Sequence, residues 1–131
     1  MRYICLIYEQ ESQWAKMSDA EKGVIYADYY KFQDEIKKSG HWLAGDPLEP
    51  THTATTVRVR SGKAQTTDGP FAETKEQLGG YYLIEAKDLD EAVAIAGRIP
   101  GARFGSIEVR PVMVVPATLD DWRQQAAGAR A

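Results

Sequence analysis

Residues 2–8 form an apolar run in which both sets of alternating positions are hydrophobic or aromatic. One set runs from Tyr3 to Ile7, and the other runs from Ile4 to Tyr8. Successive side chains of a strand point to opposite faces, and a strand that is apolar on both faces is usually covered on both sides. We therefore predict a strand at residues 2–8 with a layer against each of its faces.

Two later segments show the residue spacing of amphipathic helices. The first starts at Ser18, which forms a capping box with Glu21, and it ends at Gly40. The second opens at Asp88 and stops at Pro100. The predicted buried stripes are Ile25, Tyr29, Phe32 and Ile36 in the first helix and Leu89, Ala92, Val93, Ala96 and Ile99 in the second.

Alternation and turn residues predict the remaining strands and a tail helix. The strands are a short one beginning at residue 41, the two arms of a hairpin at 53–60 and 63–67, and single strands at 81–86 and 106–115. Pro111 has no backbone N–H, so the last strand is predicted to lie at a sheet edge. A short tail helix is predicted to start at Thr118.

The resulting order is β-α-β, an inserted hairpin and β-α-β, in a chain of 131 residues of which 44% are hydrophobic. This is the α+β, ferredoxin-like split β-α-β plan. The length suits one domain, predicted at residues 1–115, with a helical tail at 116–131. Two helices cover only one face of such a sheet, so the open face is predicted to pack against a second copy of the chain in a homodimer.

Charge and cysteine content argue against several classes of protein. The net charge is −3, and no lysine and arginine cluster offers the basic surface of a nucleic-acid-binding protein. Cys5 is the single cysteine, which precludes an internal disulfide and favours a reducing cytoplasm. We see neither a leader segment nor an apolar run of about 20 residues, so neither export nor membrane insertion is expected.

The segment Thr67–Glu76 carries more chemistry than a turn between strands requires. Asp68 precedes Gly69 and Pro70, which stiffen the backbone, and a partly desolvated carboxylate there would act as a general acid or base. Asp-Gly and Gly-Pro are also ordinary turn dipeptides, in which an aspartate caps its own turn. Both interpretations of Asp68 stay open, and Phe71 either packs against the protein or stacks on a ligand.

The two histidines, His41 and His52, are candidate partners of Asp68. They are 11 positions apart and have no neighbouring cysteine. This is not a recognisable metal-ligand spacing, so no metal site is predicted. Either histidine could reach Asp68 in the fold, because a turn after one strand often lies beside a loop from another.

Three charged residues alternate with apolar ones in the predicted strands, namely Arg58, Glu108 and Arg110. If the apolar sets face the helices, the charged sets face the second sheet and line the cavity of the dimer. They would then form either a mutually satisfied ion network or a lining that binds a small anionic ligand.

Several spaced motifs resemble the DGPF-domain proteins of the YCII-related family over roughly residues 1–115. These motifs are Thr67–Glu76, Leu78–Glu85, Asp90-Glu91-Ala92 and Gly105–Pro111. The resemblance implies a bacterial protein that forms a dimeric α+β barrel, in which two ferredoxin-like sheets enclose a cavity. Several family members place a histidine and an aspartate in that barrel, whereas the first predicted helix of this chain has no histidine. DGPF proteins are also often encoded near sigma factors of the extracytoplasmic-function type.

The first predicted function is a small-molecule-binding protein with acid/base activity in the dimer cavity. Asp68 would transfer protons together with His41 or His52, and Arg58 or Arg110 would hold an anionic group. This activity is expected to need no cofactor. The sequence has neither a glycine-rich phosphate loop nor a Gly-x-Ser-x-Gly nucleophile elbow, so nucleotide-dependent enzymes and serine hydrolases are not supported.

The alternative function is a non-catalytic regulatory or interaction module associated with extracytoplasmic-function sigma factor systems. A module of this kind would use apolar surface that remains exposed after dimerisation. The candidate side chains for that surface are Trp14, Trp42 and Trp122.

Overall fold

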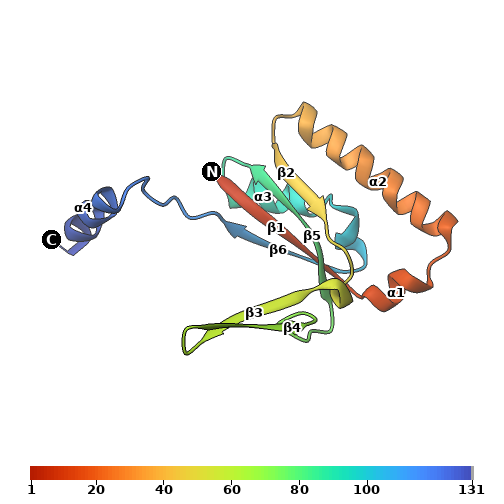
Figure 1. The fold of residues 1–131 in the computed structure, drawn as a ribbon. Coiled ribbons are helices and arrows are strands. Elements are labelled where there is room, and N and C mark those ends of the chain that lie inside the picture. The colour runs from red at the N-terminus through yellow and green to blue at the C-terminus, as the bar shows by residue number, and fades with distance from the viewer. Residues whose placement is uncertain (131) are drawn as a thin grey trace.

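A computed structural model describes residues 1–130 of the chain (Figure 1). The strands of this part are β1 (Arg2–Glu9), β2 (Trp42–Pro47), β3 (Thr55–Arg60), β4 (Lys63–Asp68), β5 (Gln77–Glu85) and β6 (Ser106–Pro111). Its helices are α1 (Glu11–Lys16), α2 (Asp19–Lys38), α3 (Leu89–Ala96) and α4 (Leu119–Arg130), with short 3-10 helices at Thr51–Thr53 and Pro100–Arg103.

The main sheet has the strand order β2-β5-β1-β6, and every neighbouring pair is antiparallel. This is the order of a ferredoxin-like split β-α-β fold, so the predicted fold class is confirmed. β6 lies at the sheet edge, as Pro111 predicted. The inserted hairpin pairs β3 with β4 as a sheet of its own, and Figure 1 shows it projecting below the main sheet.

The core lies between one face of the sheet and the helices α2 and α3. Tyr3, Cys5 and Ile7 of β1 are buried in it, whereas the alternating residues Ile4 and Leu6 on the open face are only half-buried. Burial also raises the pKa of the Cys5 thiol to about 11. β1 is therefore fully covered by this chain on one face only.

The predicted stripe of α2 is confirmed in the C-terminal half of the helix, where Phe32 and Ile36 are buried, whereas Ile25 and Tyr29 are half-buried. The stripe predicted for α3 was wrong at two positions, because Leu89 and Val93 are 52% and 53% exposed. Ile95 takes their place in the core. At 100° per residue, the buried set of Ala92, Ile95, Ala96 and Ile99 follows the spacing of a single helix face.

The helix starts predicted from sequence are formed. Ser18 Oγ accepts a hydrogen bond from the backbone N–H of Glu21 at 3.1 Å, and the Glu21 carboxylate accepts one from the backbone of Ser18 at 3.4 Å. Asp88 caps α3 by accepting from the backbone of Glu91 at 2.9 Å. These bonds satisfy N–H groups that have no partner within the helix.

The last strand ends sooner than predicted, at Pro111 rather than residue 115. The backbone N–H of Val112 still donates to the carbonyl of Arg2 at 2.8 Å, but β1 has no residue beyond this point to extend the ladder. Met113, Val114 and Val115 are consequently exposed, and Figure 1 shows the chain leading away from the sheet towards α4.

Among the helices of residues 1–130, none combines the length and the apolar character that a membrane span requires.

Candidate functional site

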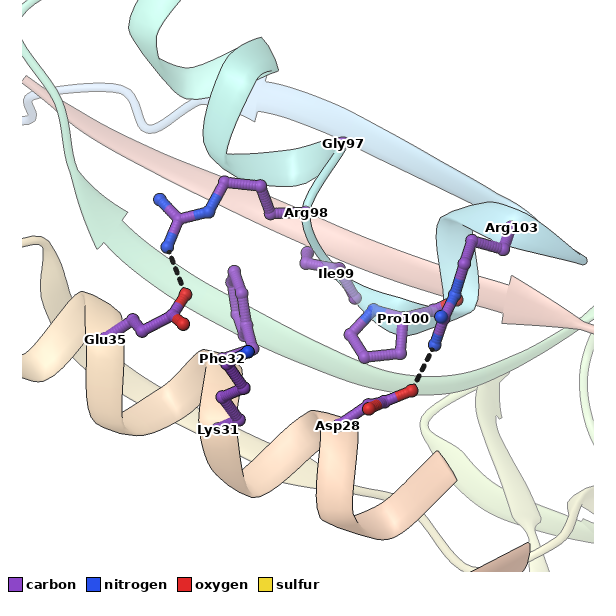
Figure 2. A pocket seen from close by; sticks show the side chains of 9 residues that line it. All are labelled: Asp28, Lys31, Phe32, Glu35, Gly97, Arg98, Ile99, Pro100 and Arg103. Carbon is purple, nitrogen blue, oxygen red and sulfur yellow. Dashed lines mark hydrogen bonds and ion pairs between the residues drawn. The ribbon is translucent and has the colours of Figure 1, made fainter. Parts of the chain in front are cut away.

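Two hollows lie against α2 and differ in their charges. The smaller, which we call the notch, has a volume of about 260 Å³ and lies between α2 and residues 97–103. Figure 2 shows two ion pairs that cross it, Asp28 with Arg103 and Glu35 with Arg98, each at 2.8 Å. Its charged groups thus satisfy one another across the packing of two elements, which is a structural role.

The larger hollow, which we call the cleft, has a volume of about 930 Å³. It lies between α2, α1, the end of β1, and the edge of the sheet formed by β2 and β5. The side chains in its lining that carry chemistry are Glu9, Glu11, Trp14, Tyr26, Tyr29, Tyr30, Gln33, Asp46, Glu49, His52, Tyr81 and Tyr82. Its size falls in the range of pockets for small organic ligands.

Glycines allow the paired strands β2 and β5, which form one wall of the cleft, to pack closely against each other. A Cβ at Gly80 would lie 3.1 Å from the carbonyl oxygen of Asp46, and a Cβ at Gly45 would overlap the ring of Tyr82. The register of β1 against β5 also shifts after Ile7, next to the end of the strand that carries Glu9. A bulge of this kind bends a strand and redirects its side chains.

Glu9 is the carboxylate with the strongest chemical signature in the cleft. Its pKa is raised by burial first, and then by the negative charges of Glu11 and Glu76. Neither a hydrogen bond nor a cation from residues 1–130 contributes an opposing effect. Glu9 is therefore suited to take up and release a proton closer to neutral pH than an ordinary glutamate.

The neighbouring Glu11 has a structural role instead. Its two carboxylate oxygens accept hydrogen bonds from the backbone N–H and the hydroxyl of Thr51, both at 2.7 Å. Its own backbone N–H donates to the side chain of Gln77 at 3.1 Å. These bonds tie α1 to the loop after β2 and to the start of β5, and they hold the mouth of the cleft together.

Three tyrosine hydroxyls are held in place by single hydrogen bonds. Tyr81 donates to Oδ2 of Asp46 at 2.9 Å, and this bond raises the pKa of Tyr81. Tyr82 accepts from the amide of Gln33 at 2.8 Å, and Tyr29 accepts from the backbone N–H of Gly101 at 3.1 Å. Burial raises the pKa of Tyr82 and of Tyr29, so both stay protonated at neutral pH. Each keeps an O–H that it can donate to a ligand.

Trp14 and Tyr26 form an aromatic wall near the mouth of the cleft. Their ring centroids are 5.5 Å apart, and the planes meet at 87°. The ammonium of Lys22 lies 5.6 Å from the centre of the Trp14 ring. The short helix α1, which the sequence did not predict, places Trp14 in this wall.

His52 is the one residue among those predicted for the site that lines the cleft. It lies in the 3-10 helix after β2, and its side chain is exposed. His41 lies elsewhere, where its two ring nitrogens contact Ser39 Oγ at 2.7 Å and Glu91 Oε1 at 3.0 Å. These contacts link the end of α2 to the start of α3, and no contact brings either histidine to Asp68.

Asp68, Phe71 and Arg58 lie together on and beside the hairpin. Asp68 is exposed at the end of β4, and the turn after it is held by the backbone of Gly69, which donates to the Ala54 carbonyl at 2.7 Å. The guanidinium of Arg58 lies 5.0 Å from the ring of Phe71. The structure therefore places these three residues outside the cleft, and the roles predicted for them stay predictions.

Glu108 and Arg110 form a third group, on the open face of edge strand β6, opposite Leu6 and Ile4 of β1. Nε of Arg110 lies 3.0 Å from Oε2 of Glu108, an ion pair by distance. Its geometry is not that of a hydrogen bond, so this buried oxygen has no hydrogen-bond partner among residues 1–130. Within this chain, Glu108 and Arg110 thus form one ion pair apart from Arg58, and the predicted lining of the dimer cavity stays a prediction.

The apolar sets of the two strands behave differently from each other. Ile107 and Val109 pack against the core, as the prediction required, whereas Val57 and Val59 are 61% and 60% exposed. The condition on which the predicted cavity lining depended therefore holds for β6 and fails for β3. The reason is that β3 belongs to the separate hairpin sheet.

The sequence-based prediction missed Glu9, Asp46 and Tyr81. A signal existed for Glu9, since a carboxylate directly follows the apolar run of β1 at a strand end. Asp46 and Tyr81 have no such signal, because only the pairing of β2 with β5 sets them opposite each other. Within residues 1–130, histidine, cysteine and carboxylate side chains do not gather in threes or more at a place that could hold a metal ion.

The fold and the cleft together define a ferredoxin-like α+β domain with a small-molecule-sized hollow between its main helix and its sheet. The chain belongs to the YCII-related domain family, whose model matches residues 1–118. The family prediction is confirmed at this level, and membership of the DGPF group stays a prediction.

Known proteins that are similar to this chain include a sequence relative and a solved structure. An uncharacterised protein of Rhizobium meliloti (strain 1021) is 40% identical over 114 residues, which cover 86% of this chain and 92% of the relative. The solved structure of 5-chloro-2-hydroxyhydroquinone dehydrochlorinase from Burkholderia phenoliruptrix AC1100, in complex with 2,5-dihydroxybenzoquinone, matches with a TM-score of 0.49 and 15% identity. That match covers 86% of this chain and 94% of the dehydrochlorinase.

Proposed function

We propose that this protein binds a small organic molecule in the cleft and moves protons on it without a cofactor. The observation that carries the proposal is Glu9, a carboxylate with a raised pKa at the wall of a hollow of about 930 Å³. A desolvated carboxylate in a cleft of ligand size is a candidate general acid or base.

The groups around Glu9 supply the other parts of such a reaction. Tyr29 and Tyr82 have O–H groups free to donate, and either hydroxyl would hold a carbonyl or hydroxyl oxygen of the ligand. His52, at the mouth of the cleft, would exchange protons with water. Proton abstraction next to a carbonyl, isomerisation and elimination are the reaction classes that fit these groups.

Hydrogen exchange tests this proposal with a panel of compounds in place of one chosen substrate. The wild-type protein would be incubated in D2O with a range of small carbonyl compounds, and deuterium entering their C–H bonds would be followed by NMR. We expect exchange of at least one compound, and we expect Glu9→Gln to slow it by about 10² to 10⁴-fold, the usual contribution of a general acid or base.

Glu73→Gln is the matched control, because Glu73 is exposed and lies outside the cleft. This variant should exchange at the wild-type rate. Exchange that survives in Glu9→Gln, or no exchange of any compound by the wild-type protein, would contradict the acid/base proposal.

We also propose a homodimer that packs through the open face of the sheet. Ile4, Leu6 and Leu83 are neighbours on that face by strand register and are half-buried in the single chain. Leu6→Glu should halve the mass in solution from twice 14.6 kDa to the chain mass, as measured by light scattering. Val24→Glu, at a 64% exposed position of α2, should keep the dimer mass, and a wild-type monomer would refute the proposal.

A second candidate function is the non-catalytic interaction module. The exposure of Val114 and Trp122, at 88% and 51%, favours it, because the tail offers apolar side chains that this chain leaves uncovered. Such a module would be indifferent to Glu9→Gln, and it would lose a bound protein partner in Trp122→Ala. The same pair of variants therefore separates the two candidates.

A further inference from the structure

The charges that line the cleft have a single sign. Four of the chain's 19 acidic residues line it, and none of the 16 lysines and arginines does. The net charge of the chain is only −3, so the cleft is more acidic than the molecule as a whole. This lining favours a negative potential in the cleft, because walls of low dielectric focus the field of charges that share one sign.

Aromatic rings are concentrated in the same place. One tryptophan and five tyrosines line the cleft, of three tryptophans and seven tyrosines in the chain. The faces of tryptophan and tyrosine rings attract cations. The chain already uses this attraction at the mouth, where the ammonium of Lys22 lies 5.6 Å from the centre of the Trp14 ring.

The carboxylates differ in how far they are already neutralised. Glu11 accepts two hydrogen bonds from Thr51, and Asp46 accepts one from Tyr81. Within residues 1–130, no hydrogen bond stabilises the ionised form of Glu9 in this way, and the charges of Glu11 and Glu76 disfavour that form. A cation beside Glu9 would relieve that repulsion, whereas an anion there would add to it.

We propose that the cleft selects a small organic cation, an ammonium group on an apolar body, over an anion of the same shape. The ammonium pairs with Glu9, and the apolar body lies against the aromatic rings. This inference rests on the proposed function, because it names the ligand class of the same cleft. The ligand inferred for the cleft is a cation, whereas the sequence predicted an anionic ligand bound by Arg58 or Arg110, which lie on the hairpin and on β6.

Three probes that share one ring and differ in charge test the inference. They are phenethylammonium, 2-phenylethanol and phenylacetate, titrated separately and followed by protein NMR shifts of the tyrosine and tryptophan rings. We expect the cation to bind at least about tenfold more tightly than the alcohol, a modest part of a Coulomb attraction at partly buried distances. The anion should bind most weakly, and added salt should narrow the differences.

Two variants assign the selectivity to the cleft. Glu9→Gln should remove most of the advantage of phenethylammonium over 2-phenylethanol, because the variant has no negative charge at this position to attract the ammonium. Glu73→Gln, which removes the same charge outside the cleft, should keep the advantage.

The outcomes separate this inference from the proposed function. Phenylacetate binding as tightly as phenethylammonium in the cleft would overturn the cation inference and leave the small-molecule cleft standing. Equal losses for all three probes in Glu9→Gln would also overturn it, because Glu9 would then act by shape alone. Binding of none of the probes would count against the small-molecule cleft itself.

Discussion

The notch and the cleft lie against the same helix and manage their charges in opposite ways. In the notch, Asp28 and Glu35 of α2 each meet an arginine at 2.8 Å (Figure 2). In the cleft, carboxylates gather without a lysine or arginine among the lining residues, and the pKa of Glu9 is raised by burial first and then by the charges of Glu11 and Glu76. Both hollows share α2 as a wall, so the difference arises from the residues that complete each lining.

The difference indicates what each hollow contributes. Paired charges at a partly exposed site add little stability and help to align the elements that carry them. Like charges held together lower stability, and proteins keep such arrangements mainly where function requires them. On this reasoning the notch holds α2 against residues 97–103, and the cleft is the candidate site for a ligand.

The largest expected effect comes from a substitution that crowds the wall of the cleft and leaves the notch unchanged. Gly45→Ala introduces a Cβ that overlaps the Tyr82 ring, so this ring, which lines the cleft, must shift. We expect a loss of about 1 to 3 kcal/mol in the free energy of unfolding, measured with urea, as for other overpacked sites. Ligand binding in the cleft should weaken in the same variant, while the two ion pairs of the notch stay in place.

Gly23→Ala is the matched control, because a Cβ at Gly23 of α2 meets no atom within 4 Å. This change should raise the free energy of unfolding by up to about 1 kcal/mol, since alanine is the better helix former. If Gly23→Ala also lowered the free energy of unfolding, or if Gly45→Ala did not lower it, the close packing at Gly45 would not explain the expected loss of stability.

A smaller effect sharpens the comparison between the two hollows. Removal of one acidic group from each hollow should change the free energy of unfolding in opposite directions. The folded state raises the pKa of Glu9, so the stability linked to this group is present at low pH and is lost as the pH rises through the folded pKa. At pH 7, Glu9→Gln should therefore raise the free energy of unfolding, by no more than about 1 kcal/mol once solvent screening is counted. This gain in the free energy of unfolding should disappear when the pH falls below 4.5, the ordinary pKa of a glutamate.

Glu35→Gln removes the partner of Arg98 in the notch and should lower the free energy of unfolding at pH 7 by about 0.2 to 1 kcal/mol. Thermal unfolding of both variants at neutral and acid pH measures the two signs together. Stabilisation by both changes, or by neither, would mean that the two hollows do not differ in the way described.

The parts of the fold that depend on local pattern were predictable. The apolar run of β1 predicted a strand, and the capping residues Ser18 and Asp88 marked two helix starts correctly. The layer predicted against the open face of β1 stays a prediction. Pro111 likewise identified an edge strand from a property of one residue. In each case the physical cause lies within a few positions of the residue concerned.

The site was less predictable because it depends on which segments meet. The segment around Asp68 has the residue types of a functional site. The alternating pattern of β3 and β4, however, does not reveal that the hairpin forms a sheet of its own and holds Asp68 outside the cleft. The raised pKa of Glu9 comes partly from Glu76, which is far away along the chain. His52 was predicted and reaches the cleft, although its expected partner Asp68 does not.

The burial of Cys5 has a practical consequence for following the molecule in solution. The side chain is fully buried, its pKa is raised to about 11, and the chain has no other cysteine. The thiolate is the nucleophile that attacks thiol reagents, so this buried thiol stays unreactive in the native state and reacts once the protein unfolds. A cysteine introduced at the cleft, such as Tyr30→Cys, could be labelled with a fluorophore while the native Cys5 stays unlabelled. The rate at which Cys5 itself reacts would report the rate at which the protein unfolds.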